Sequence, residues 1–163
     1  MAHRVVVTGL GLVAPNGNTV VASWKNTVNG VSGIAPIVAF DASGFATQIA
    51  GEIKDFDITQ FISRKEARRM DPFIHYGLAA AIEAINDAGI EVTDANANRI
   101  GAIIGSGIGG LPGIEKGYQS FLDGGPKRIS PFFVPSNIIN MVAGNLSIMY
   151  GMKGPNYGVV SAC

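Results

Sequence analysis

The apolar residues of this chain are spaced in two ways, and the clearer spacing is helical. Between residues 71 and 89, apolar side chains recur every three or four positions, which places them on one face of a helix. Asp71 is a suitable N-cap, Pro72 suits the first turn, and Gly89 suits the C-terminal end. We therefore predict a helix here, with an apolar face formed by Ile74, Leu78, Ile82 and Ile85.

Three further helices are predicted from spacing and capping residues. Residues 19–29 carry an apolar side chain every four positions, and Gly30 follows as a stop signal. Ser63 and Glu66 have the spacing of a capping box, so a short helix should follow Ser63. We also expect a helix over residues 113–122.

Short apolar runs predict strands between these helices. Residues 4–9 (RVVVTG) and 99–105 (RIGAIIG) are apolar runs that end in glycine, which is typical of buried strands. Residues 48–53 alternate weakly and suit another strand. Because strands alternate with helices, the pattern predicts a compact α/β domain with a largely parallel or mixed central sheet.

Composition narrows the possible classes of function. Hydrophobic residues make up 47% of the chain, and the 12 basic and 12 acidic residues cancel, so nothing indicates nucleic acid or a membrane surface as a partner. Residues 129–152 are uncharged, but prolines and asparagines interrupt them. We therefore expect them in a core or a subunit interface rather than in a membrane. With one cysteine and no visible secretory leader, the cytoplasm is the expected compartment.

The single cysteine, Cys163, is a candidate nucleophile. It follows a short apolar run and two small residues, which would let a substrate approach the sulfur. A lone cysteine is more often a small buried hydrophobic residue. However, Pro155 and the glycines at 154 and 158 favour a positioned turn, strand and turn over a generic core segment.

Two other motifs have alternative interpretations. Residues 105–110 (GSGIGG) match G-x-G-x-x-G after a predicted strand, but the acidic residue that would bind a ribose about twenty positions later is missing. Close packing of the loop is therefore preferred over nucleotide binding. A basic cluster lies near a predicted helix N-terminus, where the helix dipole disfavours cations. The cluster consists of Arg64, Lys65, Arg68 and Arg69. Two interpretations fit it equally well: a solvated helix face, or a binding site for an acidic partner.

Together these segments resemble the β-ketoacyl-acyl carrier protein synthases, specifically the elongating condensing enzymes of bacterial fatty acid synthesis. The resemblance implies a thiolase-like fold, in which two βαβαβαββ halves stack into a layered αβαβα arrangement. Residues 1–163 would then form most of the N-terminal half and end at the nucleophilic cysteine. The segments that carry the resemblance are RVVVTGLG (4–11), SRKEARRMD (63–71), RIGAIIGSGIGG (99–110), ISPFFVP (129–135), NMVAG (140–144) and GPNYGVVSAC (154–163).

The resemblance also implies roles for individual residues. Cys163 would carry the acyl group as a thioester, and its backbone amide would form part of an oxyanion hole. Ile108, Phe133 and Ala162 would bind the acyl chain, with Phe133 reaching it across the interface of a homodimer. The acidic acyl carrier protein would dock on Lys65, Arg68 and Arg69.

The implied reaction is the decarboxylative Claisen condensation of the acyl-enzyme with malonyl-acyl carrier protein. No cofactor and no metal ion are expected, because the phosphopantetheine arm arrives on the carrier protein. The family's two catalytic histidines and its lysine lie C-terminal to the cysteine, and neither His3 nor His75 matches them. Residues 1–163 alone are therefore expected to be inactive. A non-catalytic partner subunit is the alternative, against which Cys163 argues.

Overall fold

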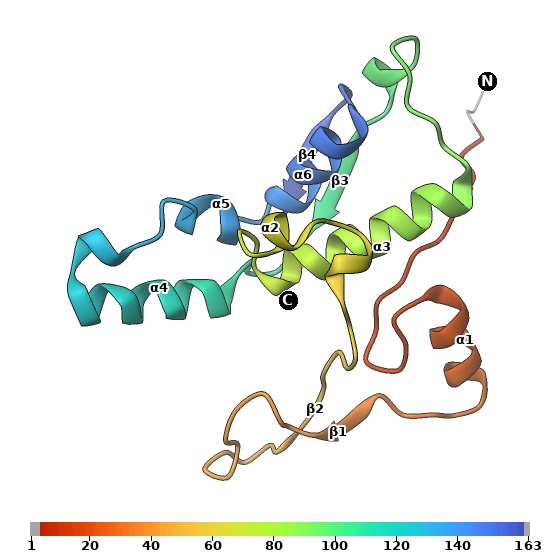
Figure 1. Cartoon of the computed structure of the whole chain (residues 1–163). Coiled ribbons are helices and arrows are strands. Elements are labelled where there is room, and N and C mark those ends of the chain that lie inside the picture. Colours follow the sequence, from red (N-terminus) through yellow and green to blue (C-terminus); the bar gives the residue numbers. More distant parts are fainter. Residues whose placement is uncertain (1–3, 162–163) are drawn as a thin grey trace. The chain divides into compact units, whose positions relative to one another are not determined.

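The structure is a computed structural model that describes residues 4–161. The main elements of this part of the chain are helices and short strands (Figure 1). In chain order they are α1 (Val20–Val28), β1 (Ile34–Pro36), β2 (Ile49–Gly51), α2 (Arg64–Ala67), α3 (Pro72–Ala88), β3 (Ala102–Gly105), α4 (Leu111–Gly124), α5 (Phe133–Asn137), α6 (Met141–Tyr150) and β4 (Asn156–Val159). Short 3₁₀ turns cover Ile58–Gln60, Ala97–Arg99 and Pro126–Arg128.

The chain divides into two compact units. Unit 1 is Met1–Asp57 with Ala79–Ile90, and unit 2 is Ile58–Leu78 with Glu91–Cys163. The boundary falls within α3, so the first part of this helix belongs to unit 2 and the second part to unit 1.

Unit 1 contains α1 and the antiparallel pair β1–β2. The Thr19 hydroxyl caps α1 by accepting a hydrogen bond from the Ala22 amide at 3.2 Å, as the predicted helix over residues 19–29 requires. β1 and β2 pair with Ile34 opposite Gly51. β2 therefore confirms the strand that was predicted over residues 48–53.

The strand predicted over residues 4–9 is wrong. This segment has no strand partner among the described residues, and Val5 is 92% exposed. The residues that follow it contact α3 instead: the Leu10 amide donates to the Asp87 carboxylate and the Leu12 amide donates to Glu83, each at 2.9 Å. An apolar run forms a strand only where a neighbouring strand supplies hydrogen-bond partners. Here two carboxylates of a helix satisfy the nearby amides.

The core of unit 2 lies where the first part of α3 packs against α6. Ile74 and Leu78 have no exposed surface, and Val142 is 2% exposed. A Cβ at Gly77 would lie 2.7 Å from a methyl group of Val142, so glycine allows the two helices to approach closely. The predicted helix over residues 71–89 is confirmed by α3, in which Ile82 is also buried and Ile85 is partly buried.

Unit 2 also contains the parallel pair β3–β4, in which Ala102 lies opposite Asn156. β3 confirms the strand predicted over residues 99–105, but the strand is not buried on both faces: Ala102 is 5% exposed and Ile103 is 65% exposed. The observed sheets are two-stranded, one antiparallel and one parallel. In the part of the chain that the structure describes, no helix is long and apolar enough to span a membrane.

Candidate functional site: a cationic pocket in unit 2

A pocket of about 470 Å³ lies in unit 2 between α4 and the segment that returns from it. α4 begins at Leu111, two residues before the expected start, and the chain turns through residues 125–130 back to α5 (Figure 1). The segment between α2 and α3 (residues 68–71) and the first residue of α3 complete the walls. Basic and aromatic side chains dominate the lining, namely Arg68, Arg69, Lys116, Arg128, Phe132 and Phe133.

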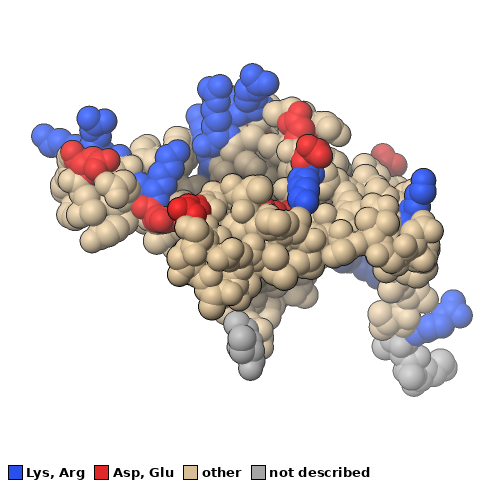
Figure 2. Space-filling model, turned by 90° about the horizontal axis from the view of Figure 1, so that it is seen from below, with Lys and Arg blue, Asp and Glu red and all other residues tan. Residues whose placement is uncertain are grey.

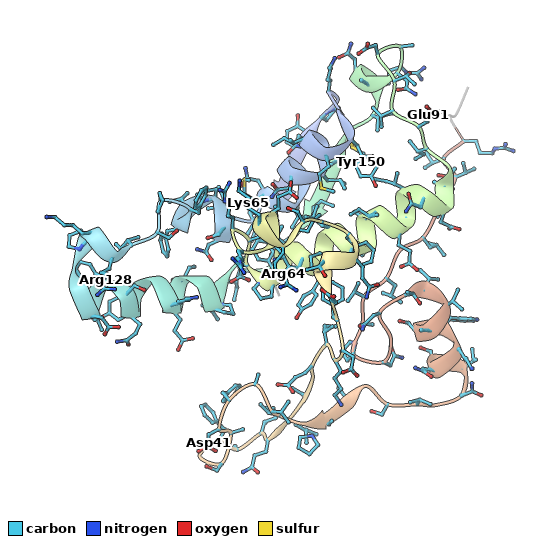
Figure 3. The ribbon with its side chains drawn as sticks, in the orientation of Figure 1. Asp41, Arg64, Lys65, Glu91, Arg128 and Tyr150 are labelled. Atoms are coloured by element: carbon cyan, nitrogen blue, oxygen red, sulfur yellow. The ribbon has the colours of Figure 1, made fainter. Side chains whose placement is uncertain are left out.

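The predicted capping box positions the basic residues of α2. The Ser63 hydroxyl accepts a hydrogen bond from the Glu66 amide at 3.2 Å, and the Glu66 carboxylate accepts one from the Ser63 amide at 3.1 Å. These bonds fix the start of a helix of only four residues. Lys65 and Arg68 are exposed on it. Figure 3 labels Arg64 and Lys65 on α2, and Figure 2 shows several groups of Lys and Arg side chains, some of them beside Asp and Glu side chains.

The same hydrogen bonds change the acidity of Glu66. The side-chain hydrogen bond from Ser63 lowers the pKa of this carboxyl, the backbone hydrogen bond from Ser63 lowers it further, and the charge of Arg69 adds a smaller effect in the same direction. Glu66 therefore remains ionised to a lower pH than an ordinary glutamate does. Its negative charge lies at the N-terminus of α2, where the helix dipole favours it.

Arg69, a member of the basic cluster, contacts Phe132, one of the two adjacent phenylalanines in the pocket lining. Its guanidinium lies 4.5 Å from the ring centroid of Phe132, within the range of a cation–π interaction. The next residue, Phe133, packs on α4, because a Cβ at Gly117 would overlap the Phe133 ring. Glycine at this position thus allows the returning segment to lie directly against the helix.

Asp71, which lines the pocket, forms hydrogen bonds that connect three helices. It is 6% exposed, and its carboxylate accepts hydrogen bonds from the Phe73 amide at 3.2 Å and from the Gly113 amide at 2.9 Å. Its own amide donates to the Ser136 carbonyl at 3.2 Å. Asp71 therefore caps α3, as predicted, and also binds the first turn of α4 and α5. Both carboxylate oxygens are occupied by backbone N–H groups.

Asn137 is the second buried polar residue of the pocket, and it is 6% exposed. Its backbone carbonyl accepts from the Gly110 amide at 2.9 Å, and its side-chain amide donates to the Phe133 carbonyl and to Ser136. Its Oδ1 atom is buried and has no hydrogen-bond partner among the described residues. A Cβ at Gly113 would overlap this oxygen, so glycine is needed there.

The pocket brings together only part of the predicted site. Arg68, Arg69 and Phe133 line it. Lys65 lies on α2, whose C-cap is Arg68, but it does not line the pocket, and Ile108 is 66% exposed in the loop after β3. Cys163 and Ala162 lie outside the described residues, so their predicted roles remain predictions.

Lys116 and Arg128 were not predicted as site residues, although both line the pocket. They follow Arg68 by about fifty and sixty residues, and neither belongs to a cluster of charges as dense as that of residues 64–69. The sequence feature that could have indicated a pocket here is the pair Gly113 and Gly117 on one face of a helix, followed by two adjacent phenylalanines. Such spacing indicates that another segment packs closely against the helix.

The geometry of residues 105–110 does not favour nucleotide binding. The Gly109 amide donates to the Ser106 hydroxyl at 3.1 Å and the Gly110 amide donates to the Asn137 carbonyl. A phosphate loop needs such amides free to face the ligand. At the start of α4, the Asp71 carboxylate occupies the position where a phosphate would bind. In the described part of the chain, no group of three or more His, Cys, Asp or Glu residues could hold a metal ion.

Comparison with known proteins places the chain in a family. The family model described as "Beta-ketoacyl synthase, N-terminal domain" matches residues 2–163. The chain is 57% identical over 161 residues to the 3-oxoacyl-[acyl-carrier-protein] synthase 2 of Vibrio harveyi, which is 99% of this chain and 39% of that protein. It is 50% identical over 161 residues to the synthase of the same name from Coxiella burnetii, with the same shares covered. The chain thus spans about two fifths of the length of these relatives.

Solved structures show the same relationship at the level of fold. The ishigamide ketosynthase/chain length factor matches with a TM-score of 0.80 and 26% identity, over 97% of this chain and 40% of that one. A type II polyketide ketosynthase in complex with its acyl carrier protein matches with a TM-score of 0.74 and 26% identity, over 92% and 40%. These neighbours give the chain the α/β fold of the thiolase-like ketosynthases. The chain belongs to the β-ketoacyl synthase family, of which it matches the N-terminal domain.

Proposed function

We propose that the protein containing this chain is an elongating β-ketoacyl-acyl carrier protein synthase, which condenses an acyl-enzyme thioester with malonyl-acyl carrier protein in fatty acid synthesis. The observation that carries this proposal is the 57% identity over 99% of the chain to a 3-oxoacyl-[acyl-carrier-protein] synthase 2. It acts in the cytoplasm as a homodimer.

Cys163 is the nucleophile of the proposed reaction. The Cys163 thiol gives up its proton, and the thiolate attacks the carbonyl carbon of the acyl group on the carrier protein. A new C–S bond forms, the C–S bond to the carrier's arm breaks, and the sulfur of that arm takes up a proton. The backbone amide of Cys163 donates to the oxygen on which negative charge develops. Ile108, Phe133 and Ala162 surround the acyl chain in this proposal.

The second half of the reaction forms the carbon–carbon bond. Malonyl-acyl carrier protein loses carbon dioxide, and the electron pair of the broken C–C bond remains on the adjacent carbon. This carbon attacks the carbonyl carbon of the acyl-Cys163 thioester. The C–S bond then breaks, which releases the β-ketoacyl product on the carrier protein and restores the thiolate. No redox partner and no additional cofactor enter this balance.

Docking of the carrier protein is supported by the surface of α2. Lys65 lies on this helix, Arg68 is its C-cap and Arg69 follows, and all three residues are exposed. Such a surface attracts an acidic partner. One neighbour of similar fold is itself a ketosynthase in complex with an acyl carrier protein, which supports the assignment.

Intact mass spectrometry tests the proposal. The complete protein is incubated with an acyl-loaded carrier protein, and we expect a mass increase of one acyl group that peptide mapping assigns to Cys163. The Cys163→Ala variant is the control and should show no increase. An unlabelled parent protein, in the presence of a carrier protein that a known synthase accepts, would instead indicate a non-catalytic partner subunit.

A further inference from the structure

Arg69 differs from the other two proposed docking cations because an aromatic ring supports its side chain. Its guanidinium lies over the ring of Phe132, 4.5 Å from the ring centroid. In the part of the chain that the structure describes, this is the one cation–π contact found, so neither Lys65 nor Arg68 has such a support there. Arg69 is nevertheless exposed, which leaves its N–H groups accessible to a partner.

The Phe132 ring belongs to a segment whose backbone is held in place. The Phe132 amide donates to the Ser130 hydroxyl at 3.1 Å, and the Phe132 carbonyl accepts from the Ser136 amide at 2.8 Å. The next side chain, Phe133, packs closely on α4 at Gly117. The ring therefore stands at a defined position, although its own side chain stays 40% exposed.

Arg69 is consequently held at both its backbone and the end of its side chain. Its amide donates to the Glu66 carbonyl at 2.9 Å, and its guanidinium rests on the Phe132 ring. An arginine side chain without such contacts samples many rotamers, and it loses this freedom when a partner binds. A guanidinium on the face of a ring keeps the N–H groups of its edge available for a carboxylate. The ring thus reduces the entropic cost of binding and leaves the donors unoccupied.

We propose that Phe132 is a positioning residue for carrier-protein docking, because its ring holds the Arg69 guanidinium ready to receive a carboxylate of the acidic carrier protein. The inference rests on the proposed function, in which Arg69 belongs to the docking surface. It adds to that surface an uncharged residue from a different segment of the chain. Phe132 acts through Arg69 and has no contact with the reacting atoms in this role.

Steady-state kinetics of the complete enzyme tests this role, with the same acyl group offered on the carrier protein and on a small thiol. Phe132→Leu removes the ring but keeps an apolar side chain. We expect it to raise the KM for the carrier-protein substrate by about threefold to tenfold more than the KM for the small thioester, with a smaller effect on kcat. Phe132→Tyr retains the ring and should restore most of the difference. Equal increases of KM for both substrates would overturn the proposal.

Phe121→Leu is the matched control for the loss of a ring. Phe121 lies on α4 in the same unit and is 43% exposed, close to the exposure of Phe132, but it does not line the pocket. Its substitution should change the two KM values equally or not at all. A preferential loss of the carrier-protein substrate in Phe121→Leu as large as that in Phe132→Leu would count against a specific role of the Arg69 contact.

A double-mutant cycle separates positioning from direct contact with the carrier protein. The Kd for the carrier protein is measured for Phe132→Leu, for Arg69→Gln and for the double variant. If the ring acts through Arg69, Phe132→Leu should weaken binding by about threefold to tenfold in the parent, but by less than about twofold once Arg69→Gln has removed the guanidinium. The same loss in both backgrounds would overturn the positioning role.

The same titrations distinguish failure of this inference from failure of the proposed function. If the parent does not bind the carrier protein, or if Lys65→Glu and Arg69→Gln leave the Kd unchanged, the docking surface is wrong and the inference falls with it. If these two variants weaken binding while Phe132→Leu does not, the docking surface stands and only the role of Phe132 is wrong.

Discussion

The carboxylate of Asp71 accepts a hydrogen bond from the backbone amide of Gly113, 2.9 Å away and 42 residues further along the chain. This bond connects the N-cap of α3 to the first turn of α4, so it holds two walls of the pocket at a fixed separation. Asp71 is 6% exposed, and water therefore cannot easily replace the bond. The arrangement predicts that the stability of unit 2 and the shape of its pocket depend on the same carboxylate.

Asp71→Ala should lower the free energy of unfolding by about 2–3 kcal/mol, since it removes a helix cap and leaves the partly buried Gly113 amide without its acceptor. Urea denaturation followed by circular dichroism measures the change. Asp94→Ala is the control: Asp94 makes only an exposed ion pair with Lys153 at 3.6 Å, so its removal should have no measurable effect. Equal stability of Asp71→Ala and the parent would show that the bond contributes nothing.

Two glycines within helices should respond to the same substitution in opposite directions. Gly144→Ala in α6 should stabilise the protein by about 0.5–1 kcal/mol, because a Cβ there meets only the Met141 sulfur at 3.8 Å and alanine favours a helix. Gly117→Ala in α4 should destabilise it by about 1–3 kcal/mol, because the Cβ would overlap the Phe133 ring. Thermal unfolding of both variants checks the signs, and a stabilised Gly117→Ala protein would contradict the packing.

The pKa of Glu66 should rise in the Ser63→Ala variant, because the largest cause of its lowering is the side-chain hydrogen bond from Ser63. NMR titration of the Glu66 carboxyl measures this directly. A carboxyl with a lowered pKa in the folded state stabilises that state fully above the pKa of the unfolded chain. The contribution is lost as the pH falls through the lowered pKa.

Asp41 provides the comparison for this titration. Its pKa is also lowered, but the backbone hydrogen bond from Ser43 is the largest cause and the side-chain hydrogen bond from Ser43 is the second. Ser43→Ala removes only the second of these causes. It should therefore restore less of the lowering at Asp41 than Ser63→Ala restores at Glu66. An unchanged Glu66 pKa in Ser63→Ala would exclude the Ser63 hydroxyl hydrogen bond as the main cause of the lowering.

The docking surface predicts a salt-dependent kinetic effect in the complete enzyme. Lys65→Glu combined with Arg68→Glu should raise the KM for carrier-protein substrates by about tenfold or more at low salt, and added salt should reduce the difference between variant and parent. Lys25→Glu is the control, since Lys25 lies on α1 in unit 1. A KM that is unchanged at low salt would remove α2 from the docking surface.

Local signals were sufficient to predict α1, α2, α3 and α4, whereas α5 and α6 were not predicted. The α3 pattern, the Thr19 cap and the capping box of Ser63 each involve residues within a few positions of one another, and all three appear in the structure. Their stabilising interactions are decided by local geometry, so the sequence carries the necessary information.

Features that depend on distant partners were not predictable in the same way. Residues 4–9 read as a strand, but no strand pairs with them among the described residues, and the neighbouring amides of Leu10 and Leu12 bond to carboxylates over seventy residues away. The pocket likewise depends on how α4 folds back against its returning segment, and only the glycines at 113 and 117 indicate it in the sequence.

The parallel pair β3–β4 has a consequence for folding kinetics. Ala102 pairs with Asn156, so more than fifty residues must be ordered or looped out before this sheet can form. Such pairing raises the contact order and the entropic barrier to folding. During synthesis, at about 5–20 residues per second, β3 leaves the ribosome several seconds before its partner. The unpaired backbone N–H and C=O groups of β3 are therefore a target for chaperones until β4 pairs with them.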